Sequence, residues 1–286
     1  MDLKQADLIK IAADTVEACE EGSYETADSI VDIEEILDDA VICTEYIAPE
    51  DEFELDDEPA RDTKISLTDE TTAVAGRRLA QDGAKVAILN FASARNPGGG
   101  WLHGAKAQEE DLCRVSCLYP CLTRPDIEYY DVNIKCKSAL YTDAMIYSPD
   151  VPFIKDENYQ PLEEPFFLSV VTCPAPNLNR SFGTSGAIRP STIQDGEEVT
   201  EKEIKEVFKR RARRVLSVMV IFEHRDIVLG AWGCGAFGNN PTLVATVFKE
   251  VLEEKQFQNR FDRVVFAVPN KESSNHKAFA KVFQQE

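Results

Sequence analysis

The chain has 286 residues, 43% of them hydrophobic and 9% aromatic, so it can bury a substantial core and does not have the composition of a disordered protein. Its net charge of −20 argues against a nucleic-acid-binding protein, which usually carries a basic surface. No apolar run approaches the roughly 20 residues of a membrane span, and the first ten residues do not resemble a signal peptide. We therefore expect a soluble intracellular protein, cytoplasmic or, in a eukaryote, nuclear.

The negative charge is concentrated at the start of the chain. Residues 1–60 hold 21 Asp and Glu against two lysines, whereas residues 61–286 hold 30 acidic and 29 basic residues. Apolar residues at helical spacing within 3–20 predict an amphipathic helix, and the stretch ending near residue 60 is expected to be an acidic surface loop. We expect an acidic, partly helical extension, residues 1–60, packed on a domain, residues 61–286, that can approach an anionic ligand.

From residue 61 onward, strands and helices are predicted to alternate. The expected strands are the apolar runs 64–67, 86–89, 166–172, 227–229 and 264–268. Helices are expected to begin after the N-caps Thr68, Thr200 and Asn240, with Glu203 completing a capping box and Pro241 in a first helical position, and a last helix is expected over 275–282. This alternation predicts an α/β fold with a mostly parallel sheet. The basic run 209–214 is interpreted as the solvated face of its helix.

Three of the eight cysteines, Cys113, Cys117 and Cys121, recur every four residues. If the segment is helical they share one face, and we interpret them as small buried residues. A metal site is the alternative, but the close Cys-x-x-Cys or His pairs typical of such sites are absent. The histidines His103, His224 and His276 show no ligand spacing either, so no metal or cofactor is expected.

Two glycine-rich loops follow the predicted strands 86–89 and 227–229. The first contains Gly98-Gly99-Gly100, and the second extends from Gly230 to Gly238. Ligands of α/β sheets bind beyond the carboxyl ends of strands, and glycine lets backbone amides approach phosphate oxygens. Tight turns also require glycine, and neither loop matches the dinucleotide fingerprint or the P-loop. Two such loops in one sheet indicate a diphosphate ligand, with the second loop leading into a helix N-terminus that favours an anion.

Glu109 and Glu110 begin a predicted helix directly behind the first loop. Acidic residues in a first helical turn are favoured by the helix dipole without any ligand. Beside bound phosphates, however, a carboxyl group would have its pKa raised by like charge, which is what a general acid near neutral pH needs.

The segments VAILNFASARNPGGG, QEEDLCR, MIYSPDVP and LGAWGCGAFGNNP resemble, in this order, those of microbial-type poly(ADP-ribose) glycohydrolases. The most specific feature is a glycine triplet followed, after seven residues, by Gln108-Glu109-Glu110. The resemblance covers roughly residues 1–286. It implies a macrodomain-like, three-layer fold with a mixed, mostly parallel sheet flanked by helices, an N-terminal helical extension, and an ADP-ribose cleft at the strand ends.

By this resemblance, Glu110 is the catalytic acid. It would protonate the departing ribose 2′-oxygen as the ribose–ribose bond breaks, and would then activate water. Glu109, the second catalytic residue of the signature, would position the adjoining ribose through hydrogen bonds.

The resemblance also implies a set of substrate-binding residues. Those for the distal ribose and its neighbourhood are Asn96, Gly98, Gly99, Gly100 and Gln108. Those for the diphosphate are Gly233, Gly235, Ala236, Phe237 and Gly238, with the Phe237 ring packing on the distal ribose. Phe279 is the candidate for stacking on adenine, and Asn270 is a second candidate for the same rim; an aromatic residue on an amphipathic helix is equally typical of a core.

The expected partners are ADP-ribose and poly(ADP-ribose) on modified proteins, with no nucleic acid and no membrane, and the protein is expected to be a monomer. The expected activity is mainly exo hydrolysis that releases ADP-ribose. The alternatives are removal of single ADP-ribose groups from protein side chains and binding of ADP-ribose without turnover. The glutamate pair argues against the last, because a binding module has no use for an acid at the scissile bond.

Overall fold

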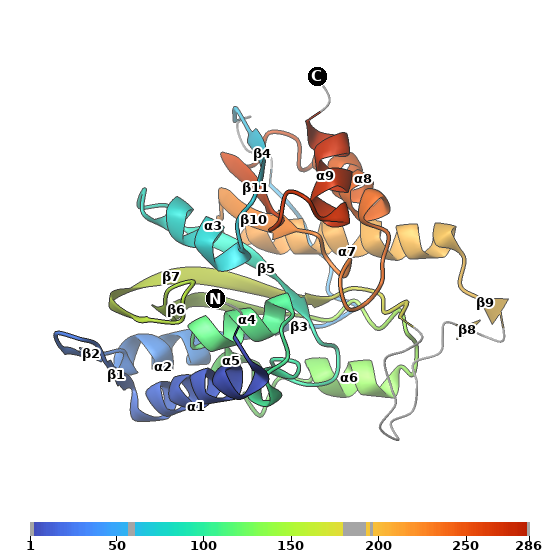
Figure 1. Ribbon diagram of the computed structural model, residues 1–286. Helices are drawn as coiled ribbons and strands as arrows, with labels where there is room; N and C mark the ends of the chain where they lie inside the picture. The colour runs from blue at the N-terminus through green and yellow to red at the C-terminus, as the bar shows by residue number, and fades with distance from the viewer. Residues whose placement is uncertain (1–2, 57–60, 180–192, 195–196, 285–286) are drawn as a thin grey trace.

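The computed structural model describes residues 3–56, 61–179, 193–194 and 197–284 (Figure 1). A seven-stranded sheet in the order β3-β6-β7-β5-β10-β11-β4 lies at its centre. The strands are β3 (Glu45–Ile47), β4 (Lys64–Thr68), β5 (Val86–Ala92), β6 (Met145–Lys155), β7 (Pro161–Pro174), β10 (Asp226–Gly230) and β11 (Arg263–Ala267). Five neighbouring strands, from β7 to β4, are parallel, while β6 is antiparallel to both β7 and β3. The mixed, mostly parallel α/β sheet is confirmed.

Helices cover both faces of the sheet, which makes three layers (Figure 1). One face packs on α7 (Glu201–Ile221), α8 (Pro241–Leu252) and α9 (Ser274–Phe283). The other packs on α1 (Gln5–Glu21), α2 (Glu34–Ile42), α3 (Thr72–Ala80), α4 (Gln108–Val115), α5 (Leu118–Leu122) and α6 (Tyr129–Lys135). Within β5, Ala87 and Leu89 face the first layer, and Val86 and Ile88 face the second. A strand buried on both faces therefore reads as a continuous apolar run.

Of the three N-cap residues expected from the sequence, two cap the N-terminus of a helix. Thr200 and Glu203 form the capping box of α7, and Asn240 caps α8 ahead of Pro241. Thr68, in contrast, is the last residue of β4, and the side chain of Thr71 caps α3 instead. The expectation for Thr68 was wrong because the parallel pairing of β4 with β11 extends the strand through that residue.

The N-terminal segment contributes to the sheet as well as to the helical layers. Its strand β3 pairs with β6 at the sheet edge, and α1 packs against α4 and the 3-10 helix η1 (Trp101–His103). Two short antiparallel pairs complete the described elements, β1 (Ser23–Glu25) with β2 (Ile30–Asp32) and β8 (Ile193–Gln194) with β9 (Glu197–Glu198).

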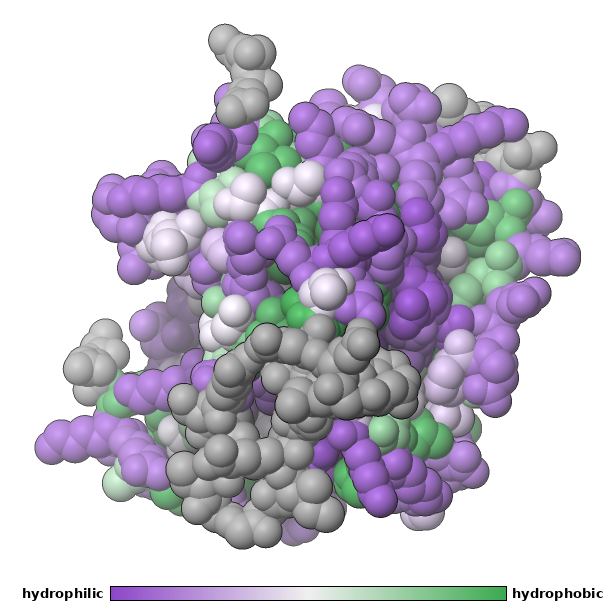
Figure 2. Space-filling view, turned by 90° about the vertical axis from the view of Figure 1, so that its right-hand side faces the viewer, coloured by the Kyte–Doolittle hydropathy of each residue, from purple (hydrophilic) through white to green (hydrophobic). Residues whose placement is uncertain are grey.

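Hydrophilic side chains predominate on the face shown in Figure 2, with separate apolar areas between them. Among the described residues, no helix is both long and apolar enough to cross a membrane.

Cys113, Cys117 and Cys121 are all completely buried, as expected, but they do not share one helix face. Helix α4 ends at Val115, and Ser116 is extended and bridges to Phe153 before α5 begins. The four-residue spacing therefore predicted burial correctly and a single continuous helix wrongly.

Candidate active site

The two glycine-rich loops begin at the same side of the sheet, where its parallel strands end. Strands β5 and β10 are adjacent and parallel, so residues 93–100 and 231–240 both begin at the carboxyl ends. The strands come close enough to require glycine at the origin of the second loop, because a Cβ on Gly230 would lie 2.7 Å from the carbonyl oxygen of Ala267 and 3.0 Å from the Phe91 ring. The topology thus brings together two loops that lie more than 120 residues apart in the chain.

The first loop packs closely on the start of α4. Gly98 and Gly99 have φ values of 67° and 60°, the left-handed region that favours glycine. The Gly99 amide donates to the carbonyl of Asn96 at 2.9 Å, which closes a turn. A Cβ on Gly98 would lie 2.6 Å from the buried indole of Trp101, so a side chain there would displace the loop. Asn96 itself is exposed on the outside of this turn.

Glu110 lies in the first turn of α4 and its side chain is half-buried. Its Oε1 accepts a hydrogen bond from the Gly100 amide at 2.9 Å. A loop amide therefore fixes the direction of a carboxyl group that still reaches the surface, which is the arrangement that a positioned general acid requires.

Glu109, by contrast, is only 2% exposed. Its Oε2 accepts from the Ser93 amide at 2.7 Å and its Oε1 from Asn90 Nδ2 at 3.3 Å. Burial raises the pKa of Glu109 to about 8, and the charge of Glu110 acts in the same direction, against the hydrogen bonds from Ser93 and Asn90. The two adjacent glutamates thus have different environments, one buried beneath the loop and one facing out beside it.

Gln108 connects α4 to the sheet. Its Oε1 accepts from the Phe91 amide at 2.8 Å, and its Nε2 donates to the Leu89 carbonyl at 2.8 Å and to Thr72 Oγ1 at 3.1 Å. Both ends of the side-chain amide therefore bind within the protein. These hydrogen bonds position α4 on the sheet, and the substrate contact expected of Gln108 from the sequence stays a prediction.

The second loop is fixed by hydrogen bonds on its buried side, and its other side is exposed to solvent. The buried Asn239 side chain donates to the carbonyls of Pro176 at 2.7 Å and of Gly233 at 3.0 Å, and Gly233 and Gly238 have φ values of 71° and 69°. Gly235, Ala236 and Gly238 are exposed, and a Cβ on Gly235 would meet no atom within 4 Å. The loop therefore presents open backbone, as an anion-binding loop does, immediately before the N-terminus of α8.

Phe237 is half-buried, and its ring lies 6.3 Å from that of Tyr141, at an interplanar angle of 51°. Tyr141 has a φ of 59°, which is uncommon for a residue with a side chain. The Tyr141 hydroxyl accepts from Asn177 Nδ2 at 3.3 Å. Sequence reasoning missed Tyr141, because no local pattern signals a positive φ at a tyrosine.

Arg211 on α7 holds the backbone that carries Tyr141. This completely buried guanidinium donates to the carbonyls of Tyr141, Leu140 and Pro174, and its Nε donates to Asp143 Oδ1 at 2.8 Å. It was expected to belong to a solvated basic face. Lys209, Arg210 and Arg213 of the same run do form ion pairs with acidic side chains. Arg211 instead points inward and fixes the backbone beside the site.

Phe279 does not lie at a ligand-accessible position. It is completely buried, and its ring lies 5.5 Å from Phe266 and 6.2 Å from Phe283 in the core between α9 and the sheet. The expected adenine-stacking role is therefore corrected to a core role, the alternative that the helical pattern already allowed. Asn270 is exposed, with a φ of 67°, and its amide donates to Asp69.

No group of three or more His, Cys, Asp or Glu side chains is placed to hold a metal ion within the described part of the chain. Two of the histidines are buried and bonded within the protein: His224 lies 2.8 Å from the Tyr147 hydroxyl, and His276 lies 2.7 Å from the Val268 carbonyl.

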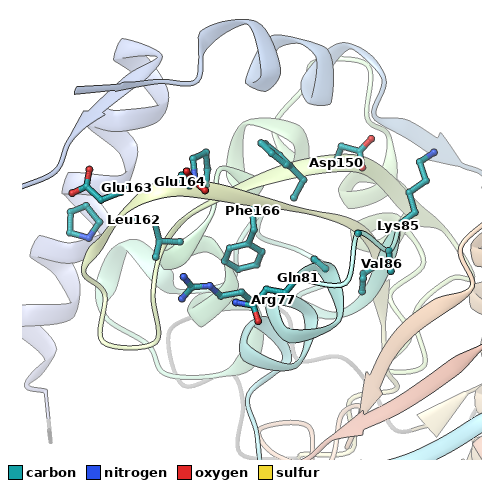
Figure 3. A pocket seen from close by; sticks show the side chains of 15 residues that line it. Arg77, Gln81, Lys85, Val86, Asp150, Leu162, Glu163, Glu164 and Phe166 are labelled. Atoms are coloured by element: carbon teal, nitrogen blue, oxygen red, sulfur yellow. The ribbon is translucent and has the colours of Figure 1, made fainter. Parts of the chain in front are cut away.

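A separate cavity of about 840 Å³ lies near the start of β5, at the opposite end of this strand from the first glycine-rich loop (Figure 3). It is lined by α3, the start of β5 and the first half of β7, and Arg77 lies over the Phe166 ring, 5.5 Å from its centroid. No residue of either glycine-rich loop lines it. We therefore distinguish this cavity from the candidate active site.

Comparison with known proteins agrees with the site. Residues 12–156 match the family model of the microbial-type poly(ADP-ribose) glycohydrolase (PARG) catalytic domain. Poly(ADP-ribose) glycohydrolase from Thermomonospora curvata is 40% identical over 97% of this chain and 100% of that chain, with a TM-score of 0.86. The Deinococcus radiodurans enzyme, solved in complex with ADP-ribose, is 39% identical over 87% of this chain and 96% of that chain, with a TM-score of 0.74. A search of curated proteins finds no match.

Proposed function

The chain belongs to the microbial-type poly(ADP-ribose) glycohydrolase family and is a glycosidase that cleaves ADP-ribose polymers, and we propose that Glu110 is its catalytic acid. One observation carries this assignment: the half-buried carboxyl of Glu110 is held by the Gly100 amide at 2.9 Å, where the first glycine-rich loop meets α4. Because Oε1 takes that hydrogen bond, Oε2 is the oxygen that we assign to proton transfer.

In the proposed reaction, protonated Glu110 gives its proton to the ribose 2′-oxygen as the ribose–ribose bond breaks. The sugar carbon that loses this oxygen becomes oxocarbenium-like, and the diphosphate of the same ADP-ribose unit stabilises its charge. The Glu110 carboxylate then takes a proton from a water molecule, whose oxygen attacks the sugar carbon. One water is consumed, and Glu110 regains its proton.

Glu109 supports this cycle from beneath the loop. Its carboxyl fixes the Ser93 amide where β5 passes into the first loop, and it precedes Glu110 on the same helix. Because burial raises the pKa of Glu109 to about 8, the group holds its proton near neutral pH and adds no second negative charge beside Glu110. We propose that Glu109 positions the loop and the adjoining ribose.

The ligand is proposed to lie across both loops. The open backbone around Gly235 and Gly238 would take the diphosphate, and the distal ribose would lie between the Gly98–Gly100 turn and the Phe237 ring. Binding of one terminal ADP-ribose unit in this way supports exo cleavage that releases ADP-ribose from chain ends.

The charges on α7 support the expectation that the protein does not bind nucleic acid. Lys205 and Lys209 pair with Glu250, Arg213 pairs with Glu254, and Arg210 and Arg211 pair with Asp143. Basic side chains paired with carboxylates present little positive field, so this helix offers no strong binding surface for a nucleic-acid backbone.

The test compares wild type, Glu110→Gln and Glu164→Gln on labelled, automodified poly(ADP-ribose). Glu164 is an exposed glutamate beside the separate cavity, so it controls for loss of a carboxylate. We expect wild type and Glu164→Gln to release ADP-ribose, and Glu110→Gln to be slower by roughly 10²–10⁴-fold while still binding ADP-ribose in calorimetry.

Near-wild-type turnover by Glu110→Gln would show that the acid is misassigned. If wild type left the polymer intact while binding ADP-ribose, the polymer assignment would fail. Proteins carrying single arginine- or glutamate-linked ADP-ribose would then be the substrates to test.

A further inference from the structure

A buried lysine far from the glycine-rich loops binds the N-terminal helix. Lys155, near the end of β6, is 7% exposed, and its Nζ donates to Thr15 Oγ1 at 2.7 Å and to the Ile11 carbonyl at 3.0 Å. Both acceptors belong to α1. The N-terminal helix is thus attached to the sheet through a buried ammonium group.

The same threonine reaches the helix that carries Glu110. Thr15 is completely buried, and its Oγ1 lies 2.7 Å from the Arg114 carbonyl in the last turn of α4 and 3.0 Å from the Ile11 carbonyl. A hydroxyl has one hydrogen to donate. Because Lys155 already supplies a donor to Ile11, the shorter contact, to Arg114, is the one that the Thr15 hydrogen serves.

Helix α1 also contacts the segment between the glycine triplet and α4. Gln5 Nε2 donates to the His103 carbonyl at 2.8 Å, and Lys106 Nζ donates to the Leu3 carbonyl at 2.9 Å. Gly104 is so close that a Cβ there would lie 2.8 Å from the backbone oxygen of Gln5. The middle of the segment between Gly100 and Glu110 therefore contacts α1 at Gln5 and the residue Leu3 just before α1.

Lys155 is poorly explained as a stabilising residue. Its two hydrogen bonds go to uncharged oxygens, and burial lowers its pKa to about 8, although the charge of Asp14 opposes this shift. Burying an ammonium group without a bonded carboxylate costs folding free energy. The presence of Lys155 in the core is therefore better explained by the residues that it positions than by a gain in stability.

We propose that Lys155 and Thr15 are positioning residues that set α4 against the first loop, so that Glu110 meets the Gly100 amide. The chain of contacts runs from Lys155 Nζ through Thr15 Oγ1 to the Arg114 carbonyl, one helical turn beyond Glu110. This inference rests on the proposed role of Glu110. Neither residue touches the substrate, so their loss acts on turnover through the placement of Glu110.

The matched pair Thr15→Val and Thr15→Ser tests the relay. Valine has the shape of threonine without the hydroxyl, whereas serine keeps it. We expect Thr15→Val to lower kcat about tenfold or more, since a small misplacement of a catalytic group is costly. KM and ADP-ribose affinity should stay within about twofold, because the proposed diphosphate loop is held by the Asn239 side chain and not by the hydrogen bonds of Thr15. Thr15→Ser should recover most of kcat.

Lys155→Met is the second variant, and it remains informative if Thr15→Val does not fold. Removing the buried charge should leave the melting temperature unchanged or raised while kcat falls. Hydrogen exchange of peptides covering residues 98–115 should become faster in both kcat-deficient variants. A residue of purely structural importance would instead lower the melting temperature together with the activity.

The inference is overturned if folded Thr15→Val and Lys155→Met keep kcat within about twofold of wild type, or if kcat, ADP-ribose affinity and melting temperature fall together. Glu110→Gln is measured alongside. If it retains turnover, the proposed catalytic acid fails whatever the Thr15 and Lys155 variants do. If it is inactive while Thr15→Val and Lys155→Met are fully active, only the positioning inference fails.

Discussion

A side chain on Gly99 would collide with the carboxyl group of Glu110, because a Cβ there would meet Oε1 and lie 2.9 Å from Cδ. The same Cβ would lie 3.3 Å from Glu109 Oε2. The middle glycine of the triplet therefore serves two purposes. It permits a φ of 60°, and it leaves room for the Glu109 carboxyl beneath the loop and for the Glu110 carboxyl beside it.

Gly99→Ala is expected to lower kcat by roughly 10²-fold, because Glu110 must move away from its proposed position. Gly83→Ala is the matched control: Gly83 has a φ of 77°, but a Cβ there meets nothing within 4 Å. Both variants should lose about 1 kcal/mol of unfolding free energy from backbone strain. Steady-state kinetics and urea unfolding measure the two effects. Equal activity of the two alanine variants would contradict the collision argument.

Gly235→Ala is expected to show the opposite pattern, with normal stability and impaired binding. Its added methyl group meets no protein atom within 4 Å and points into the space assigned to the diphosphate. We expect ADP-ribose affinity to weaken about tenfold or more, equivalent to roughly 1.4 kcal/mol. Calorimetry and thermal unfolding decide the point; unchanged affinity would remove Gly235 from the ligand site.

Glu109→Gln is expected to change the pH dependence of stability. The pKa of Glu109 is raised from 4.5 to about 8 in the folded state, so between these pH values the folded protein binds more protons than the unfolded chain. The contribution of Glu109 to the free energy of unfolding is therefore present below pH 4.5 and is lost as the pH rises through about 8. Urea unfolding from pH 5 to 8 should show a shallower decline in Glu109→Gln than in wild type. If the free energy of unfolding declined equally in the two proteins, burial would not shift the pKa of the Glu109 carboxyl group.

Phe279→Ala is expected to destabilise the protein by about 3–5 kcal/mol through the cavity that it leaves. The ring is completely buried against Phe266 and Phe283, so ADP-ribose affinity of the folded variant should be unchanged. Phe279→Leu, which keeps most of the volume, controls for gross unfolding. A large loss of affinity at normal stability would restore the adenine-stacking role.

Arg211 and Arg210 bind the same carboxylate, which makes them a matched pair. Arg211 is completely buried and holds three backbone carbonyls, so Arg211→Met should cost about 3–5 kcal/mol. Arg210 is half-exposed, and Arg210→Met should cost less than about 1 kcal/mol. Chemical denaturation measures both. At concentrations where both are folded, Arg211→Met should also raise KM, because Tyr141 loses its support beside Phe237.

The sequence was sufficient for features that depend on near neighbours. The capping box at Thr200 and the cap at Asn240 involve hydrogen bonds over two or three residues, so residue types at fixed spacing identify them. The apolar runs of β5, β10 and β11 identify strands buried on both faces. The glycine triplet and the adjacent glutamates are likewise only ten residues apart, and the structure does join Gly100 to Glu110.

Other features depend on partners that are distant in sequence, and only the tertiary structure decided them. An aromatic residue at the Phe279 position of an amphipathic helix fits either the core or the rim of a ligand site. Only the packing of α9 against the sheet shows that Phe279 belongs to the core. The strand β3 is three residues long, and its pairing with β6, about 100 residues away, has no local signature. Thr15 and Lys155 are separated by 140 residues. Local patterns determined the capped helix starts at Thr200 and Asn240 and the strands buried on both faces. Long-range packing determined the strand β3, the continuation of β4 through Thr68, and which distant side chains are brought together.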